Sequence, residues 1–160
     1  MTEIPAIRPA TTDDFDPLLE IRKEIAVYLL QRGIASNPNA LRRHHLEEWT
    51  AERVLWVAES KGTVVGSIAV WFHDPTNYWP RADLATYVRD LMVHPLYRHQ
   101  GFGAVILGWA ERLSAGKGRS RVRLDCESSN ERLCRYYKEE GYRHVVTDKD
   151  GFALFEKVLH

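Results

Sequence analysis

Hydrophobic residues recur every three to four positions in several stretches of the chain, which is the spacing of a helix with one buried side. Gly33 and Gly141 follow two of these stretches, at the kind of place where a glycine commonly ends a helix. Ser128 and Glu131 have the spacing of a capping box, so the last helix is expected to begin there. The pattern predicts helices over residues 12–29, 41–52, 102–116 and 128–141.

Shorter segments rich in β-branched and aromatic residues predict strands. Lys61–Gly62 is typical of a two-residue hairpin turn, and Asp150–Gly151 is placed in the same way between the last two strands. Segment 73–81 contains two prolines and is expected to be a loop. The expected strands are 6–10, 54–60, 64–72, 84–93, 122–126, 142–146 and 152–158. The order of elements predicts the α/β (α+β) class, with helices on both faces of a mixed sheet rather than a doubly wound parallel sheet.

Length and charge narrow the class of protein. A chain of 160 residues fits one core, so residues 1–160 are expected to form a single domain. Equal numbers of basic and acidic residues, 22 of each, argue against bulk attraction to nucleic acid or to an anionic membrane, although they allow a local basic pocket. The longest apolar run, residues 25–30, is far too short to span a bilayer, and the N-terminus has no signal-peptide pattern. We therefore expect a cytoplasmic protein.

The two cysteines, Cys126 and Cys134, are too few for a disulfide framework and lack the spacing of a CxxC metal site. We interpret both as small hydrophobic core residues, which suits a reducing compartment. The histidines, including the adjacent His44 and His45, have no metal-ligand spacing, so we expect no bound metal.

Residues 97–104 read YRHQGFGA and lie between a predicted strand and a predicted helix. Gly101 and Gly103 leave the backbone N–H groups of this turn open to an anion. The helix start adds unpaired donors and partial positive charge, and Arg98 adds a full charge, so the segment is expected to bind a diphosphate. Two other interpretations are a tight turn without a ligand and a dinucleotide-binding fingerprint. The fingerprint is disfavoured because Ile106 stands where it needs a third glycine.

A second, longer pattern follows. It reads Asn130-x-x-Leu133-x-x-x-Tyr137-x-x-x-Gly141-Tyr142, across the last predicted helix and into the next strand. Either pattern alone occurs by chance in many proteins. The two patterns together, in this order and in a strand–turn–helix–strand–helix context, are specific.

Together, the two patterns resemble the GCN5-related N-acetyltransferase (GNAT) family, whose members transfer an acetyl group from acetyl-CoA to an amine. Arg98-x-x-Gly101-x-Gly103 matches the family's diphosphate loop. The second pattern departs from the family mildly, since Leu133 replaces an alanine and Tyr142 a phenylalanine. The resemblance covers nearly the whole chain. It implies a mixed, mostly antiparallel central sheet of about six to seven strands flanked by four helices.

The resemblance implies acetyl-CoA as co-substrate. Backbone groups of Met92 and Val93 would pair with its pantetheine arm, and an N–H there would stabilise negative charge on the thioester oxygen. The side chains of these two residues are expected in the core. Arg98 and the backbone N–H groups of the loop would hold the diphosphate. The loop residues are His99, Gln100, Gly101, Phe102, Gly103 and Ala104.

The resemblance also assigns catalytic candidates. Tyr137 is expected to protonate the departing thiolate, because a phenol with a reference pKa of about 10 is neutral at physiological pH. The alternative is a packing tyrosine, which is the favoured interpretation for the neighbouring Tyr136. Asn130 resembles the residue that hydrogen-bonds the cofactor, and it can also start a helix.

The general base is less well defined by the sequence. Asp90 lies on the strand expected to border the acetyl group, and it is our candidate, although a purely structural carboxylate is the favoured interpretation. Glu127 and His94 are weaker candidates. An amine that binds in its neutral form needs no dedicated base.

The predicted activity is acetyl-CoA-dependent N-acetylation of a primary amine on a small molecule, such as an antibiotic, a polyamine or an amino acid. The alternatives are acetylation of a protein or peptide amine, and a non-catalytic acyl-CoA-binding module. We expect no nucleic-acid or membrane partner, and the resemblance allows a homodimer. The candidate acceptor-site residues are Tyr28, Arg32, Trp49, Trp71, Phe72, His73, Tyr78 and Trp79.

Overall fold

The computed structural model describes residues 3–79 and 84–160. It contains two compact units, each made of two separate chain segments. The described parts of 1–69 and 90–109 form the first unit, and those of 70–89 and 110–160 form the second. Residues 80 and 81 of the expected loop lie outside the described residues. The expectation of a single domain stays a prediction.

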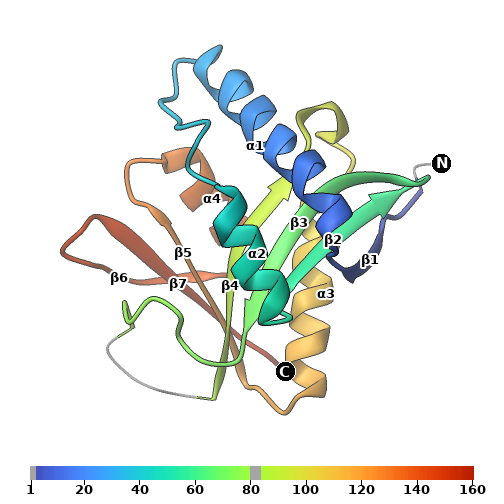
Figure 1. The fold of residues 1–160 in the computed structure, drawn as a ribbon. Coiled ribbons are helices and arrows are strands. Elements are labelled where there is room, and N and C mark those ends of the chain that lie inside the picture. The colour runs from blue at the N-terminus through green and yellow to red at the C-terminus, as the bar shows by residue number, and fades with distance from the viewer. Residues whose placement is uncertain (1–2, 80–83) are drawn as a thin grey trace. The chain divides into compact units, whose positions relative to one another are not determined.

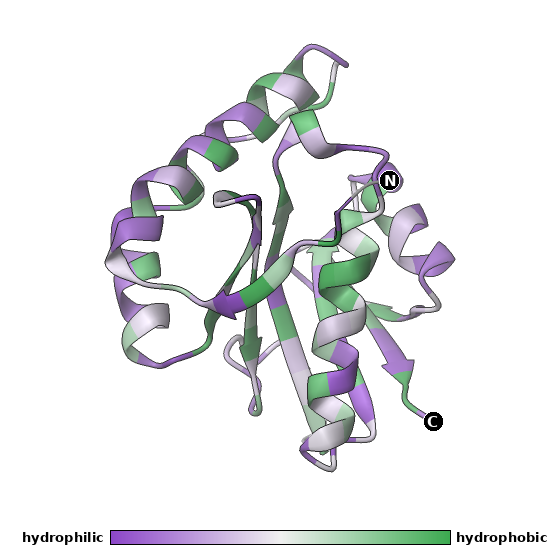
Figure 2. Ribbon diagram, turned by 90° about the vertical axis from the view of Figure 1, so that its right-hand side faces the viewer, coloured by the Kyte–Doolittle hydropathy of each residue, from purple (hydrophilic) through white to green (hydrophobic). Residues whose placement is uncertain are grey.

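The first unit contains strands β1 (Ala6–Pro9), β2 (Leu55–Ser60) and most of β3 (Thr63–Trp71), which pair antiparallel in this order. Two helices belong to it, α1 (Phe15–Leu30) and α2 (Arg43–Ala51), as do two short 3-10 turns, at Thr12–Asp14 and Pro95–Tyr97 (Figure 1). Hydrophobic and hydrophilic residues alternate along the helices, as the periodicity predicts (Figure 2). The fully buried side chains of this unit include Leu18, Leu46, Val57, Val65, Ile68 and Ile106.

The second unit contains β5 (Arg121–Glu127), α4 (Glu131–Glu139), β6 (Arg143–Thr147) and β7 (Phe152–Val158). Residues 85–88 pair in parallel with β5, and β5 and β6 both pair antiparallel with β7. Strand β4 (Ala85–Val93) and helix α3 (Phe102–Gly116) run from one unit into the other, as β3 does.

The strand order is β1-β2-β3-β4-β5-β7-β6, so the predicted mixed, mostly antiparallel sheet and the four helices are confirmed. None of the helices in the described ranges is long and apolar enough to cross a membrane.

The predicted start of the last helix is wrong. The N-cap of α4 is Asn130, whose side-chain oxygen accepts a hydrogen bond from the N–H of Leu133 at 3.1 Å. Ser128 does not cap the helix, because its N–H donates to the carbonyl of Gly151 at 2.8 Å and continues the pairing between β5 and β7. Likewise α2 begins at Arg43, two residues after the predicted start at Leu41.

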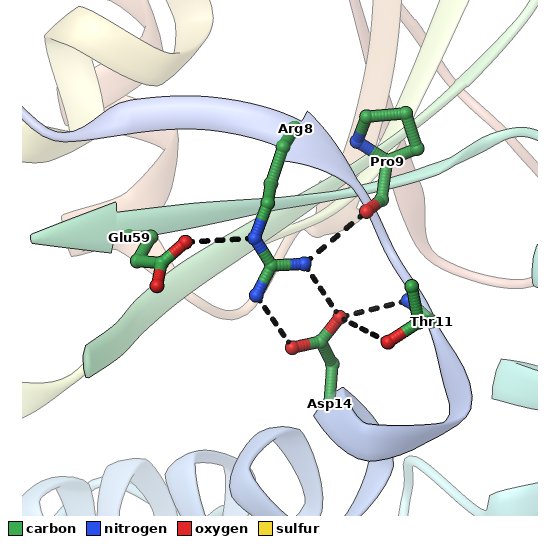
Figure 3. A network of polar contacts seen from close by, with 5 residues as sticks. All are labelled: Arg8, Pro9, Thr11, Asp14 and Glu59. Atoms are coloured by element: carbon green, nitrogen blue, oxygen red, sulfur yellow. Dashed lines mark hydrogen bonds and ion pairs between the residues drawn. The ribbon is translucent and has the colours of Figure 1, made fainter. Parts of the chain in front are cut away.

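A polar network ties β1 and β2 to the start of α1 within the first unit (Figure 3). The guanidinium of Arg8 donates to both carboxylate oxygens of Asp14, each at 2.9 Å, and to Glu59 at 2.7 Å. The N–H of Thr11 also donates to Asp14, at 2.8 Å. Burial acts to raise the pKa of Asp14, but the hydrogen bonds from Arg8 and Thr11 outweigh it and hold the pKa below its usual value.

Candidate active site

After β4 the chain turns sharply before α3. The N–H of His94 still donates to the carbonyl of Val65 at 2.8 Å, which holds the end of β4 beside β3. The ring Nδ1 of His94 accepts from the N–H of Leu96 at 3.1 Å, and the N–H of Tyr97 donates to the His94 carbonyl at 2.9 Å. His94 therefore fixes the first bend of the segment that contains the predicted anion loop.

The loop itself has alternating backbone conformations. His99 and Gly101 have φ angles of +63° and +77°, both in the left-handed region. A Cβ on Gly101 would meet nothing within 4 Å, so this glycine is required by its backbone angle and not by crowding. The concavity formed by such alternation exposes successive N–H groups, which is a geometry that binds anions.

Helix α3 adds more donors to the same loop. Its first hydrogen bond runs from the N–H of Val105 to the carbonyl of Gly101, at 3.1 Å. The N–H groups of Phe102, Gly103 and Ala104 therefore lie in the first turn, where no intrahelical acceptor exists. Phe102 is buried, with 3% of its surface exposed, and anchors the helix start, whereas His99, Gln100 and Gly101 are exposed.

The side chain of Arg98 lies on an aromatic ring of α1. Its guanidinium carbon is 3.7 Å from the ring centre of Tyr28, and that of Arg32 is 3.4 Å from the same centre. Tyr28 and Arg32 are expected in the acceptor site, which stays a prediction, and the structure places both beside the arginine of the loop. The only indication of this cluster in the sequence is the spacing of Tyr28 and Arg32, which places both on one face of a helix.

Strand β4 is distorted at Asp90. This residue has a φ of +56°, which is unusual for a residue other than glycine in the middle of a strand. The buried hydroxyl of Ser67 on β3 lies 3.1 Å from both the carbonyl and the carboxylate oxygen of Asp90, and donates to this pair. The contact supports the favoured interpretation of Asp90 as a structural carboxylate, and it leaves its role as a base untested.

The segment after Asp90 lies very close to β3. A Cβ placed on Gly66 would come within 2.3 Å of the carbonyl oxygen of Met92, so only glycine fits there. The side chain of Met92 is buried, with 5% exposure, and that of Val93 is half-buried. The expectation that the side chain of Met92 belongs to the core is confirmed.

Tyr137 lies on α4 in the second unit, and Asn130 is the N-cap of the same helix. The ring of Tyr137 is 6% exposed and lies about 6 Å from the rings of Tyr142 and Phe155. Burial, with smaller contributions from Cys126 and Tyr136, raises the pKa of Tyr137, so its phenol is protonated throughout the physiological range. Asn130 caps the helix through its oxygen, which leaves the NH₂ of its amide for another acceptor.

Tyr136 differs from its neighbour. Its hydroxyl is buried, and among the described residues it has no hydrogen-bond partner. Burial, and then the charges of Glu140 and Glu111, raise its pKa to about 12. Of the two weaker base candidates, Glu127 is exposed at the end of β5, and the ring of His94 is used in the turn described above.

A buried charged cluster lies in the second unit, and no pattern in the sequence predicts it. Arg123 and Glu156 are 3% and 5% exposed and form an ion pair of 2.8 Å between β5 and β7. Arg123 also donates to the hydroxyl of Tyr87 at 3.0 Å, and its guanidinium lies 4.5 Å from the ring centre of Trp79. Charged residues in a strand are normally expected to face solvent, so burial of Arg123 and Glu156 was not predicted. Of the residues in this cluster, only Trp79 was a candidate, as part of the acceptor site.

The expected acceptor residues divide between the units. Tyr28, Arg32 and Trp49 belong to the first, and the other five to the second. Trp71 is buried, whereas Tyr78 stacks on Phe152 with ring centres 5.1 Å apart. The loop before Trp79 is ordered by Asp74, whose carboxylate accepts from the N–H groups of Thr76 and Trp79 at 2.8 and 3.1 Å.

The chain is similar to known acetyltransferases over nearly its full length. Thialysine N-epsilon-acetyltransferase of Mus musculus is 26% identical over 156 residues, which cover 93% of this chain and 89% of the relative. A crystal structure of a GNAT-family acetyltransferase from Listeria monocytogenes 4b F2365 has a TM-score of 0.82 and 22% identity, and the match covers 97% of this chain and 95% of that one.

A second solved structure contains the cofactor. The PaiA N-acetyltransferase of Thermoplasma acidophilum, in complex with coenzyme A, has a TM-score of 0.70 and 19% identity, with 99% of both chains covered. Such low identities establish the fold alone. The family model for Acetyltransferase (GNAT) family matches residues 19–142, which include the anion loop, Asp90, Asn130 and Tyr137. This chain is an acetyltransferase and belongs to the GNAT family.

Proposed function

We propose that this acetyltransferase transfers the acetyl group of acetyl-CoA directly to a primary amine of a small molecule. The observation that carries the proposal is the loop at residues 98–104, where left-handed residues and a helix start turn consecutive N–H groups outward beside an arginine. Acetyl-CoA, when bound, supplies an activated thioester and a diphosphate handle.

The loop residues fit a diphosphate. Donors come from the N–H groups of His99 to Ala104, and the open space at Gly101 leaves room for phosphate oxygens close to the backbone. Arg98, held by the ring of Tyr28, adds positive charge at the same place. Coenzyme A in the Thermoplasma relative of the same fold supports this assignment.

Other residues act at the thioester end of acetyl-CoA. Backbone groups of Met92 and Val93 bind and orient the pantetheine arm, and an N–H of this segment stabilises negative charge as it develops on the thioester oxygen. The distortion at Asp90 and the close approach at Gly66 set the course of this backbone. Tyr137 holds a proton at its hydroxyl and donates it to the departing sulfur, and Asn130 hydrogen-bonds the cofactor through its amide NH₂.

The base is assigned to Asp90 only for an amine that arrives protonated. Its carboxylate accepts from Ser67, which orients it. An amine that binds neutral bypasses this step, so the pH dependence of turnover distinguishes the two cases.

A small-molecule amine is the favoured acceptor. The murine relative, which is similar over nearly the whole chain, is named for acetylation of the side-chain amine of thialysine. Aromatic side chains of the expected acceptor site, such as Tyr78 and Trp79, suit a cationic ligand of that size.

The test is a panel of acceptors with acetyl-CoA, followed by detection of free coenzyme A thiol. The panel contains amino acids, thialysine, polyamines, aminoglycosides and short peptides with free N-termini. Product mass spectra must show acetylation, and a reaction without acceptor gives the hydrolysis background. Turnover of a small amine supports the proposal, whereas turnover of peptides alone overturns the substrate class.

A further inference from the structure

Two thiols lie side by side in the second unit. Cys126 is at the end of β5 and Cys134 is in the first turn of α4, and their sulfur atoms are 3.5 Å apart. Both cysteines are free. We expected both to be buried hydrophobic residues, which is right for Cys126 and wrong for Cys134, which is half-buried.

The two thiols differ in access. Cys126 is buried, with 6% exposure, whereas Cys134 is half-buried and lines an open cleft of about 370 Å³. Three basic side chains, Arg135, Lys138 and His144, line the same cleft beside Cys134, with Glu131 as its acidic member. The cleft therefore suits a reagent that carries carboxylates and a reactive sulfur.

We propose that Cys126 and Cys134 form a dithiol site, which an anionic disulfide such as oxidised glutathione converts to an intramolecular disulfide. The sulfur of Cys134 attacks one sulfur of the reagent, its S–S bond breaks, and one glutathione leaves as a thiol. Cys126 then attacks the sulfur of Cys134 in the mixed disulfide, and the second glutathione leaves. The two cysteines lose two electrons and two protons, and the reagent disulfide gains them.

The order of attack follows from burial. Cys134 faces the cleft and is the one that a bulky disulfide can reach. Burial, and then the hydrogen bond with Cys134, raise the pKa of Cys126, which disfavours its thiolate and makes it a poor first nucleophile. Once Cys134 is in a mixed disulfide, Cys126 is the adjacent thiol that can resolve it.

Closure requires a small movement. A disulfide bond is about 2.05 Å long, so the sulfurs must approach by about 1.5 Å. Strand β5 is held along its length by β7, whereas α4 has only nine residues, so the helix is the element that adjusts. Tyr137 lies three residues after Cys134 on that helix, and oxidation would therefore shift the proposed acid. This last consequence alone rests on the proposed function.

The test is incubation of the protein with oxidised glutathione, followed by tryptic peptide mapping under non-reducing conditions. Trypsin cleaves after Arg123, Arg132 and Arg135, so the two cysteines fall on different peptides unless a disulfide joins them. The wild-type protein is expected to lose two hydrogens and to yield the linked pair of peptides. Dithiothreitol must reverse both changes.

Matched variants separate the steps. Cys126→Ser is expected to stop at the mixed disulfide and to carry glutathione on Cys134, at a level about tenfold above that of wild type. Cys134→Ser is expected to remain unmodified, and Cys→Ala versions and a circular dichroism spectrum check that each variant folds. A wild-type chain that stays reduced, or that keeps glutathione on Cys134 without forming the linked peptides, overturns the proposal. These readouts do not involve acetyl transfer, so they remain decisive if the proposed activity is absent.

Discussion

The guanidinium carbon of Arg98 lies 3.7 Å from the centre of the Tyr28 ring, and this contact joins the anion loop to helix α1. Arg32 lies on the same ring, so one tyrosine orients two arginines. A cation over an aromatic face is restricted in where it can point. The loop arginine is therefore positioned by a residue far from it in sequence.

Replacement of Tyr28 by leucine is expected to weaken coenzyme A binding about twofold to fivefold. The reason is the loss of a cation–π contact worth about 0.5–1 kcal/mol, after which Arg98 is no longer held beside the loop. Tyr28→Phe keeps the ring and is the matched control. Calorimetry with coenzyme A gives both dissociation constants, and equal values for wild type and Tyr28→Leu would refute the positioning role.

Gly66→Ala is expected to destabilise the protein by about 1–3 kcal/mol, because the new methyl group must push against a neighbouring backbone. Its Cβ would lie 2.3 Å from the carbonyl oxygen of Met92. The displaced segment is also the one proposed to bind pantetheine, so coenzyme A affinity should fall. Denaturant unfolding and calorimetry measure the two effects.

Gly116→Ala is the control for this change. Gly116 is the last residue of α3, and a Cβ there would meet nothing within 4 Å. We expect stability unchanged or slightly raised, since alanine is the better helix former. If both alanine variants behave alike, the close approach at Gly66 is not the cause.

The turn before α3 was predictable because its signals are local, whereas its role in binding an anion stays a prediction. Two glycines, an arginine and the start of an amphipathic helix lie within a few residues, and the structure places them as expected. The position of Arg98 on Tyr28 was not predictable, because it depends on how α1 packs against the turn after β4. The distortion at Asp90 was equally hidden, since it depends on the buried hydroxyl of Ser67 in another strand.

The structure explains why position 142 can hold tyrosine where the family pattern has phenylalanine. The hydroxyl that distinguishes it from phenylalanine donates to Glu111 at 3.2 Å. Lys157 donates to the other oxygen of Glu111 at 2.8 Å, so the buried hydroxyl is part of an ion-paired network. Sequence patterns could place Tyr142 in the core but could not supply Glu111, which lies on α3.

Tyr137→Phe is expected to lower kcat by about 10²- to 10⁴-fold and to leave the dissociation constant of coenzyme A nearly unchanged, because proton donation to sulfur is lost while the ring stays in place. Tyr136→Phe is the adjacent control. Its buried hydroxyl has no partner among the described residues, so removal should be neutral or slightly stabilising. Steady-state kinetics on both variants test the assignment, and unchanged turnover in Tyr137→Phe removes this residue from the mechanism.

Asp14→Asn is expected to make stability less dependent on pH in the acidic range. The pKa of Asp14 is lowered in the folded protein, so its ionised form contributes stability that is fully present above the unfolded pKa of about 3.9. This contribution is lost as the pH falls through the lower folded value. Arg8 is 37% exposed, so solvent screening limits the expected loss at pH 7 to about 1 kcal/mol.

Thermal unfolding from pH 7 down to pH 2 measures this effect. At pH 7 the Tm of Asp14→Asn should lie about 2–4 °C below that of wild type, and the two curves should converge at the acidic end. Asp16→Asn is the matched control, because its carboxylate is 85% exposed and its ion pair with Arg43 lies in solvent. A constant difference between wild type and Asp14→Asn across the whole pH range would show that the carboxylate in Figure 3 stabilises the fold by packing and not by its charge.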